Sequence, residues 1–241
     1  MSVSTGSAPG ASPSHAATRR ALLDAAADVF AARGFQNATV REICRRAGAN
    51  IAAVNYHFGD KASLYGAVLV ELSNLARDRY PADAGLPANA TPRQRLAAFI
   101  RSFLQRVLSE ELSARHGRIM AREMVEPTGA LNRMVREYIQ PQADLLRDLL
   151  RDLLPPGTDP SQTRLCGLSI VGQILFYAHC RPVLQRLQPS GAFTHPPLDT
   201  LAEHITAFSL AALDAFARGK SGIPAPGPEP RRKRRPSGLH A

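Results

Sequence analysis

A group of polar and basic side chains between residues 39 and 61 could bind the phosphates and base edges of DNA. Thr39 places a hydroxyl, with the free N–H groups of a helix start, where a phosphate could sit, and Arg41 adds a cation. Asn55 can pair with an adenine edge, and Tyr56 can hydrogen-bond a phosphate or stack on a sugar. The predicted DNA contacts are Thr39, Arg41, Asn50, Ala53, Asn55, Tyr56, His57 and Lys61.

Two alternatives stay open for this segment. Its helices could form a short hairpin that only packs in the core, although the basic residues and helix caps favour DNA binding. His57 could equally contact DNA, cap a helix or pack inside the protein.

Helical periodicity surrounds this group and places it on two short helices. Apolar residues recur at one helix face over about 18–33, and again between residues 39 and 58 and after residue 60. The helices on either side of the turn at 47–49 fit a helix-turn-helix, in which the second helix enters the major groove. The expected caps and stops of these helices are Thr18, Gly34, Thr39, Gly48, Asn50 and Asp60.

The rest of the chain also has helical spacing, and no alternating strand pattern is convincing, so we predict an all-α fold of about nine helices. A helix bent at Pro141 should end near residue 154, an apolar segment covers 160–187, and the last helix runs over 198–217. The expected organisation is a flexible leader (1–16), a helix-turn-helix domain (17–62), a helical ligand-binding and dimerisation domain (63–219) and a flexible basic tail (220–241).

Charge and cysteine content narrow the function classes. The chain has 241 residues and a net charge of +10, of which residues 1–61 carry +3 and the run 231–235 carries +5. Excess positive charge at both ends favours a nucleic-acid partner over a membrane surface. Three cysteines do not make a secreted disulfide scaffold, and no signal peptide or spanning segment is visible. We therefore expect a cytoplasmic protein.

Residues 18–69 resemble the DNA-binding domain of the tetracycline-repressor (TetR/AcrR) family. The matching stretches read AAxxxFAxxGF, then Ala-Thr-Val-Arg-Glu-Ile at 38–43, then YHFGDKxxLY. The resemblance implies a homodimeric repressor that a small molecule releases from a palindromic operator. It also implies pairing of the last two helices, so we expect the dimer to form through 160–187 and 198–217.

A weaker resemblance, to the CecR/YbiH-like branch of that family, lies in the C-terminal part. It is carried by residues 121–128, the Tyr-Ile-Gln-Pro turn at 138–141 and the segments 171–177 and 181–183. It implies control of efflux or drug-sensitivity genes. The candidate ligand-binding residues are Phe103, Met120, Arg122, Glu123, Tyr138, Gln173 and Tyr177.

Structural roles are an alternative to effector binding for several of these residues. Arg118, Arg122 and Arg133 lie near Glu123 in sequence, so structural ion pairs are expected there. Gln173 and Tyr177 could be satisfied core groups as well as pocket or interface groups. Because aromatic and apolar residues dominate this region, we expect a partly hydrophobic effector.

Enzyme and metal chemistry find no support in the sequence. The glycine–serine stretch at 167–171 misses a nucleophile elbow, and the Gly-Lys-Ser at 219–221 lacks the other features of a phosphate loop. Cysteines lack paired metal-ligand spacing, and Cys44 should be a small core residue. We predict no enzyme, cofactor or metal, and keep as the alternative a helical dimer that binds DNA with little sequence preference.

Overall fold

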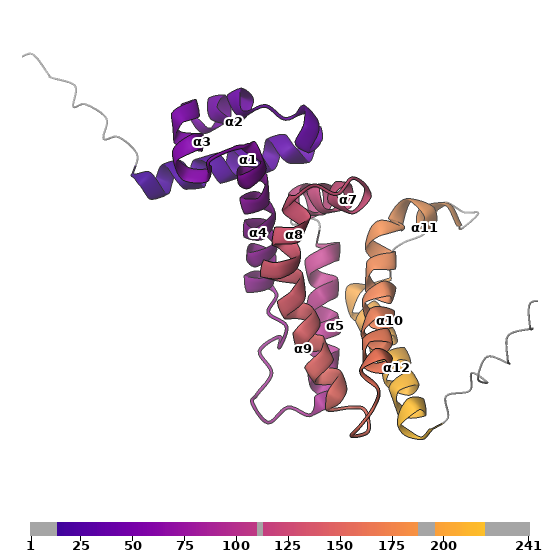
Figure 1. The fold of residues 1–241 in the computed structure, drawn as a ribbon. Helices are drawn as coiled ribbons and strands as arrows, with labels where there is room; N and C mark the ends of the chain where they lie inside the picture. The colour runs from indigo at the N-terminus through magenta and orange to yellow at the C-terminus, as the bar shows by residue number, and fades with distance from the viewer. Residues whose placement is uncertain (1–13, 110–112, 188–195, 220–241) are drawn as a thin grey trace, which may run out of the picture.

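In the computed structural model, residues 14–109, 113–187 and 196–219 are described, and all secondary structure within them is helical (Figure 1). The helices are α1 (His15–Asn37), α2 (Val40–Ala47), α3 (Ile51–Phe58), α4 (Lys61–Arg79), α5 (Pro92–Leu108), the π-helical turn η1 (Ser113–Gly117), α7 (Arg118–Val125), α8 (Ala130–Met134), the π-helical turn η2 (Val135–Ile139), α9 (Gln140–Arg151), α10 (Pro160–His179), α11 (Arg181–Leu187) and α12 (Leu198–Ala217). The all-α prediction is confirmed.

Helix α1 begins earlier than the sequence indicated. Ser14, not Thr18, is its N-cap, and the Ser14 hydroxyl accepts the N–H of Ala17 at 3.3 Å. Residues 15 and 16 therefore belong to α1 and not to the leader. Gly34 does leave helical geometry, with φ 73°, as expected. The rest of the expected leader (1–13) and the tail (220–241) lie outside the described residues.

Two prolines mark breaks in the later helices. The expected disturbance at Pro141 takes the form of the π-helical turn η2 directly before α9, because proline offers no N–H to continue the α-helical ladder. The segment 160–187, expected as one helix, is divided at Cys180 into α10 and α11. Pro182 lies in the first turn of α11, where its missing N–H is tolerated.

Two hydrophobic cores divide the molecule. The first packs α1, α2, α3 and α4 together with Ile119, Ala130 and Met134. The second packs α5, α9, α10 and α12. We call α1–α3 the head and α5–α12 the C-terminal domain; α4 runs from the head into the C-terminal domain (Figure 1). Because the first core includes side chains from α4, α7 and α8, it extends across the domain boundary expected at residue 62.

Helices α10 and α12 lie side by side at the edge of the C-terminal domain, on the side opposite α4 (Figure 1). In the described part of the chain, no helix is long and apolar enough to cross a membrane.

Candidate nucleic-acid interface

The turn between α2 and α3 is built from local capping bonds. The Thr39 hydroxyl accepts the N–H of Glu42 at 3.2 Å, and the Asn50 Oδ1 accepts the N–H of Ala53 at 2.8 Å. Gly48 ends α2 in the left-handed conformation, with φ 63° and ψ 30°. Ile43 on α2 is fully buried in the first core. These bonds confirm the predicted caps and fix the angle between the two helices.

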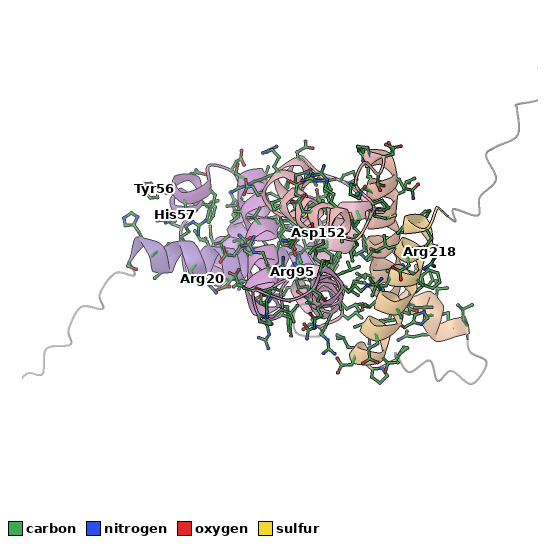
Figure 2. The ribbon with its side chains drawn as sticks, turned by 90° about the horizontal axis from the view of Figure 1, so that it is seen from below. Arg20, Tyr56, His57, Arg95, Asp152 and Arg218 are labelled. Carbon is green, nitrogen blue, oxygen red and sulfur yellow. The ribbon has the colours of Figure 1, made fainter. Side chains whose placement is uncertain are left out.

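Helix α3 presents a polar and aromatic face. Val54 is fully buried and anchors the helix, whereas Asn55 is exposed and Tyr56 is 72% exposed. His57 is half-buried, so its exposure alone does not choose between contact with DNA and packing inside the protein. Figure 2 shows Tyr56 and His57 at the end of the molecule far from Arg218. An exposed Asn–Tyr pair on a rigid helix suits contact with base edges and phosphates.

Sequence reasoning missed His15, which joins this face from the first turn of α1. Its ring centroid lies 5.3 Å from that of Tyr56 and 5.9 Å from that of His57. The rings of Tyr56 and His57 are themselves 5.0 Å apart, at an interplanar angle of 85°. The missing signal was the Ser14 cap, which brings residue 15 into the helix.

The cations of the head divide into paired and unpaired groups. Arg33 and Arg46 both bind the carboxylate of Glu42, at 2.9 and 3.2 Å. Arg41 and Arg45 are exposed, and among the described residues neither has an ion-pair partner. Unpaired surface cations beside an exposed helix are the groups most available to a phosphate backbone.

Lys61, a predicted phosphate contact, already has a structural task. Its Nζ donates to the Gln36 carbonyl at 3.1 Å and lies 4.7 Å from the centre of the Phe35 ring. These contacts hold the start of α4 to the end of α1. A phosphate would share this ammonium with the carbonyl, since an ammonium offers three donors.

Below the head, a buried carboxylate joins α4 to the C-terminal domain. Glu123, 1% exposed, accepts from the Tyr65 hydroxyl at 3.0 Å and from the N–H and hydroxyl of Thr128 at 2.8 and 2.9 Å. Burial, and then the Glu123 charge, raise the pKa of Tyr65 above its ordinary range. The sequence predicted only apolar periodicity after residue 60, with no partner for Tyr65, and that partner lies 58 positions away.

The expected ion pairs of Glu123 are wrong. Arg122 is exposed and donates to the Ala32 carbonyl at 3.4 Å, and its guanidinium covers Gly34, where a Cβ would meet Arg122 Nη1 at 2.7 Å. Arg133 pairs with Glu137 of the adjoining turn η2 at 2.9 Å. A second bridge to the head joins Arg115 to Asp28 at 2.6 Å. Neutral donors thus satisfy Glu123, while Arg115 and Arg122 tie the C-terminal domain to α1.

Signals for other chemistry are weak in the described residues. They contain no group of three or more His, Cys, Asp or Glu side chains that could hold a metal. Cys44 is buried in the first core as predicted, and burial raises the pKa of its thiol, which makes it less reactive.

Comparison with known families decides the class of protein. Residues 22–68 match the tetR family of bacterial regulatory proteins. Residues 92–213, half of the chain, match the C-terminal domain of the HTH-type transcriptional dual regulator CecR. The chain is a CecR-type member of the tetR family. The two resemblances seen in the sequence are confirmed, and so is the prediction of a DNA-binding transcriptional regulator instead of an enzyme.

Relatives of this tetR-family regulator agree with the match. It is 27% identical to the transcriptional dual regulator CecR of Shigella flexneri over 170 residues, which are 66% of this chain and 74% of CecR. It is 41% identical to the transcriptional regulator BetI of Rhizobium meliloti over 83 residues, which are 34% of this chain and 40% of BetI.

Solved structures show the same fold. A transcriptional regulator from Pseudomonas aeruginosa superimposes with a TM-score of 0.63 at 22% identity, over 83% of this chain and 92% of the other. The regulator AibR, solved with isovaleryl coenzyme A and operator DNA, has a TM-score of 0.57 at 18% identity, over 79% and 97% of the two chains.

The candidate effector residues of the regulator do not gather in one place. Phe103 and Tyr177 pack against the second core, whereas Met120 and Tyr138 pack against the first. Gln173 is half-buried and donates to the Ser169 carbonyl at 3.3 Å.

The remaining two candidates, Arg122 and Glu123, line a cavity of about 540 Å³ between the head and α7. A larger cavity, of about 770 Å³, lies elsewhere in the regulator, between the end of α4, the segment 80–91, the start of α5, and α9. None of the candidate residues lines it.

Proposed function

We propose that this regulator is a homodimeric repressor that binds a two-fold symmetric operator through α3 and is released by a small-molecule effector. The observation that carries the proposal is the exposed Asn55–Tyr56 face of α3, held by the Asn50 cap and the buried Val54. The proposed DNA contacts are those predicted from sequence, with His15 added. AibR, a structural neighbour solved with an acyl-CoA and operator DNA, offers a precedent for a regulator that binds both.

A symmetric dimer follows from the small size of the reading element. Helix α3 has eight residues, so one copy can reach few base pairs. Two copies double the contacts and fix the half-site spacing near one turn of DNA, ~34–36 Å. The outer faces of α10 and α12, which carry exposed apolar side chains, support pairing of these helices between two copies.

The test is binding of the purified protein to DNA from upstream of its own gene, at two salt concentrations and with random competitor DNA. We expect Asn55→Ala to weaken specific binding by about 10- to 100-fold, as loss of a base contact of ~1–3 kcal/mol requires. Arg41→Gln should weaken specific and random DNA alike and lower the salt slope by about one. Asn132→Ala, an exposed asparagine on α8, is the matched control and should change neither.

Two outcomes would count against the proposal. Equal competition by random DNA at moderate salt would favour the alternative, a helical dimer with little sequence preference. An unchanged affinity of the Asn55→Ala and Tyr56→Ala variants would remove α3 as the reading helix.

A further inference from the structure

The 770 Å³ cavity at the end of α4 has the size of a small-molecule site. Leu86, Leu145 and Leu149 give it apolar walls, and Arg77 and Arg95 give it two guanidinium groups. Arg95 is partly engaged, because its Nη2 donates to the Ala88 carbonyl at 2.8 Å. The lining therefore combines apolar surface with donors suited to carboxylate or phosphate oxygens.

Behind this wall lies a buried cation whose partners within the described part of the chain are all neutral. Arg106 on α5 is 3% exposed. Its Nε donates to the Ser102 carbonyl at 3.3 Å and its Nη1 to Gln142 Oε1 at 2.8 Å, and the Phe103 ring centre lies 5.4 Å from its Cζ. Among the described residues, no carboxylate forms an ion pair with it.

Electrostatics around Arg106 point to a missing negative charge. Burial lowers the pKa of its guanidinium, and the positive charge of Arg77 lowers it further, against the raising effect of Tyr138. A buried charge without a counter-charge is costly and is retained where something else can compensate it.

Gln142 links this cation to the cavity. Its side chain accepts from Arg106 and also lines the cavity wall. An anion in the cavity would thus meet Arg77 and Arg95 directly, with Gln142 between it and the charge of Arg106.

The lining also contains two carboxylates, those of Asp78 and Asp83, which would favour a cationic ligand instead of an anion. Asp78 pairs with Arg77 at 3.6 Å and its side chain is 70% exposed. Asp83 is exposed and accepts the N–H of Gly85 at 3.3 Å. Both therefore face solvent or a local partner, and the buried charge beside the cavity is positive.

We propose that this cavity binds an amphipathic anion, with a carboxylate or phosphate head at the arginines and a compact apolar body against the leucines. Resting on the proposed function, this cavity is the effector site of the regulator. Arg77 lies in the last turn of α4, and the first turn of the same helix carries Lys61, which is bound to the head. A ligand that prefers one position of α4 would shift the equilibrium between head positions.

The experiment compares four eight-carbon probes that differ in their heads: octanoate, octyl phosphate, octanol and octylamine. Binding to the full-length protein is measured by titration calorimetry. At least one anion should bind about 10-fold or more tightly than octanol and octylamine, and the better anion distinguishes a carboxylate from a phosphate site. Equal binding of all four heads would overturn the proposal.

Variants locate the site. Arg77→Gln and Arg95→Gln should each weaken the better anion by about 10-fold, since each removes a charge-assisted contact. Arg101→Gln is the matched control: it lies on α5, pairs with Asp199 and does not line the cavity, and should leave binding unchanged. If Arg77→Gln, Arg95→Gln and Arg101→Gln all bound the anion with the same affinity, this cavity would not be the binding site. Arg106→Met should weaken binding as well, because it removes the positive charge behind Gln142, and the other variants keep the test valid if this one fails to fold.

Glu110 and Glu111, which lie outside the described residues, are tested as a counter-charge from the chain itself. The double variant Glu110→Gln/Glu111→Gln should keep the unfolding temperature of the free protein. A clear fall in that temperature, with anion binding unchanged, would assign the counter-charge to the chain and overturn the proposal.

Operator binding separates this proposal from the proposed function. Saturation with the better anion should change operator affinity, and operator should change anion affinity by the same factor. Arginine-dependent binding that leaves operator affinity unchanged would overturn the effector role while the DNA-binding function stands. If the protein bound the anion but no operator, the anion site would stand and the proposed function would be wrong.

Discussion

Two polar side chains near α4, the buried Glu123 and the half-buried His116, have neutral partners. The Glu123 carboxylate accepts from Tyr65 and Thr128, so it needs no arginine. His116 Nε2 lies 3.1 Å from the hydroxyl of Ser73, which is itself fully buried. Burial lowers the pKa of His116 to about 4, so the ring stays neutral in the folded protein at neutral pH.

His116 makes stability fall in acid. Its folded-state pKa lies below its unfolded value, so between about pH 6.5 and 4 the unfolded chain takes up a proton that the folded protein refuses. The free energy of unfolding should drop by about 2 kcal/mol from this group between pH 7 and pH 5. Urea unfolding at the two pH values measures the drop.

The variant His116→Gln keeps a polar partner for Ser73 and does not titrate, so most of that drop should disappear. His179→Gln, at an exposed position, should behave as the unaltered protein does. An equal pH dependence in His116→Gln would show that other groups cause the acid loss.

At the scale of elements, local signals and core packing act on different parts of the head. The α2–α3 turn is set by residues that are neighbours in sequence: two side-chain caps and a left-handed glycine. Helix α4, in contrast, completes the first core with Leu64, Val68 and Leu69, and side chains from α7 and α8 cover it. The helix that leaves the head is thus also part of its core, which suits it to carry movement between the two.

Gly48 tests the local part of this scheme. No atom lies within 4 Å of a Cβ built there, so a substitution costs only backbone strain. We expect Gly48→Ala to lower the free energy of unfolding by about 1 kcal/mol and Gly48→Asn by less, because asparagine tolerates the left-handed region. Thermal unfolding of both variants is the measurement. An equal cost for both would point to a contact, and not to strain, at this turn.

At the scale of the whole molecule, α10 and α12 expose large apolar side chains that a single chain does not cover. Leu165, Leu168 and Phe176 on α10 are 57%, 60% and 46% exposed, and Phe208 on α12 is 61% exposed. The spacing of the α10 residues puts them on one face of the helix. Large apolar side chains gathered on two adjacent helices are typical of a protein–protein interface.

We therefore expect Leu168→Glu and Phe208→Glu to convert a dimer into a monomer, because each would bury charge between two apolar faces. Sedimentation at micromolar concentration measures the mass, and operator affinity should fall by about 100-fold or more with loss of the second half-site. Val125→Glu, at a position 80% exposed on α7, should leave the mass unchanged. A dimeric mass in both interface variants would place the contact elsewhere.

The sequence by itself determined the features that depend on near neighbours. The all-α class, the caps at Thr39, Asn50 and Asp60, and the last helix at 198–217 could be predicted because capping and amphipathic periodicity are local. The family motif around the helix-turn-helix added the class of function.

Only the tertiary structure decided which distant groups meet. Sequence reasoning paired Glu123 with arginines nearby in the chain, whereas folding brings Tyr65 to it from 58 positions away. It left Arg106 unremarked as one of many arginines, because its burial depends on α5 and α9 packing together. Spacing along a chain fixes which residues share a helix face, but charge burial and cavity lining follow from how the faces pack, which no local pattern contains.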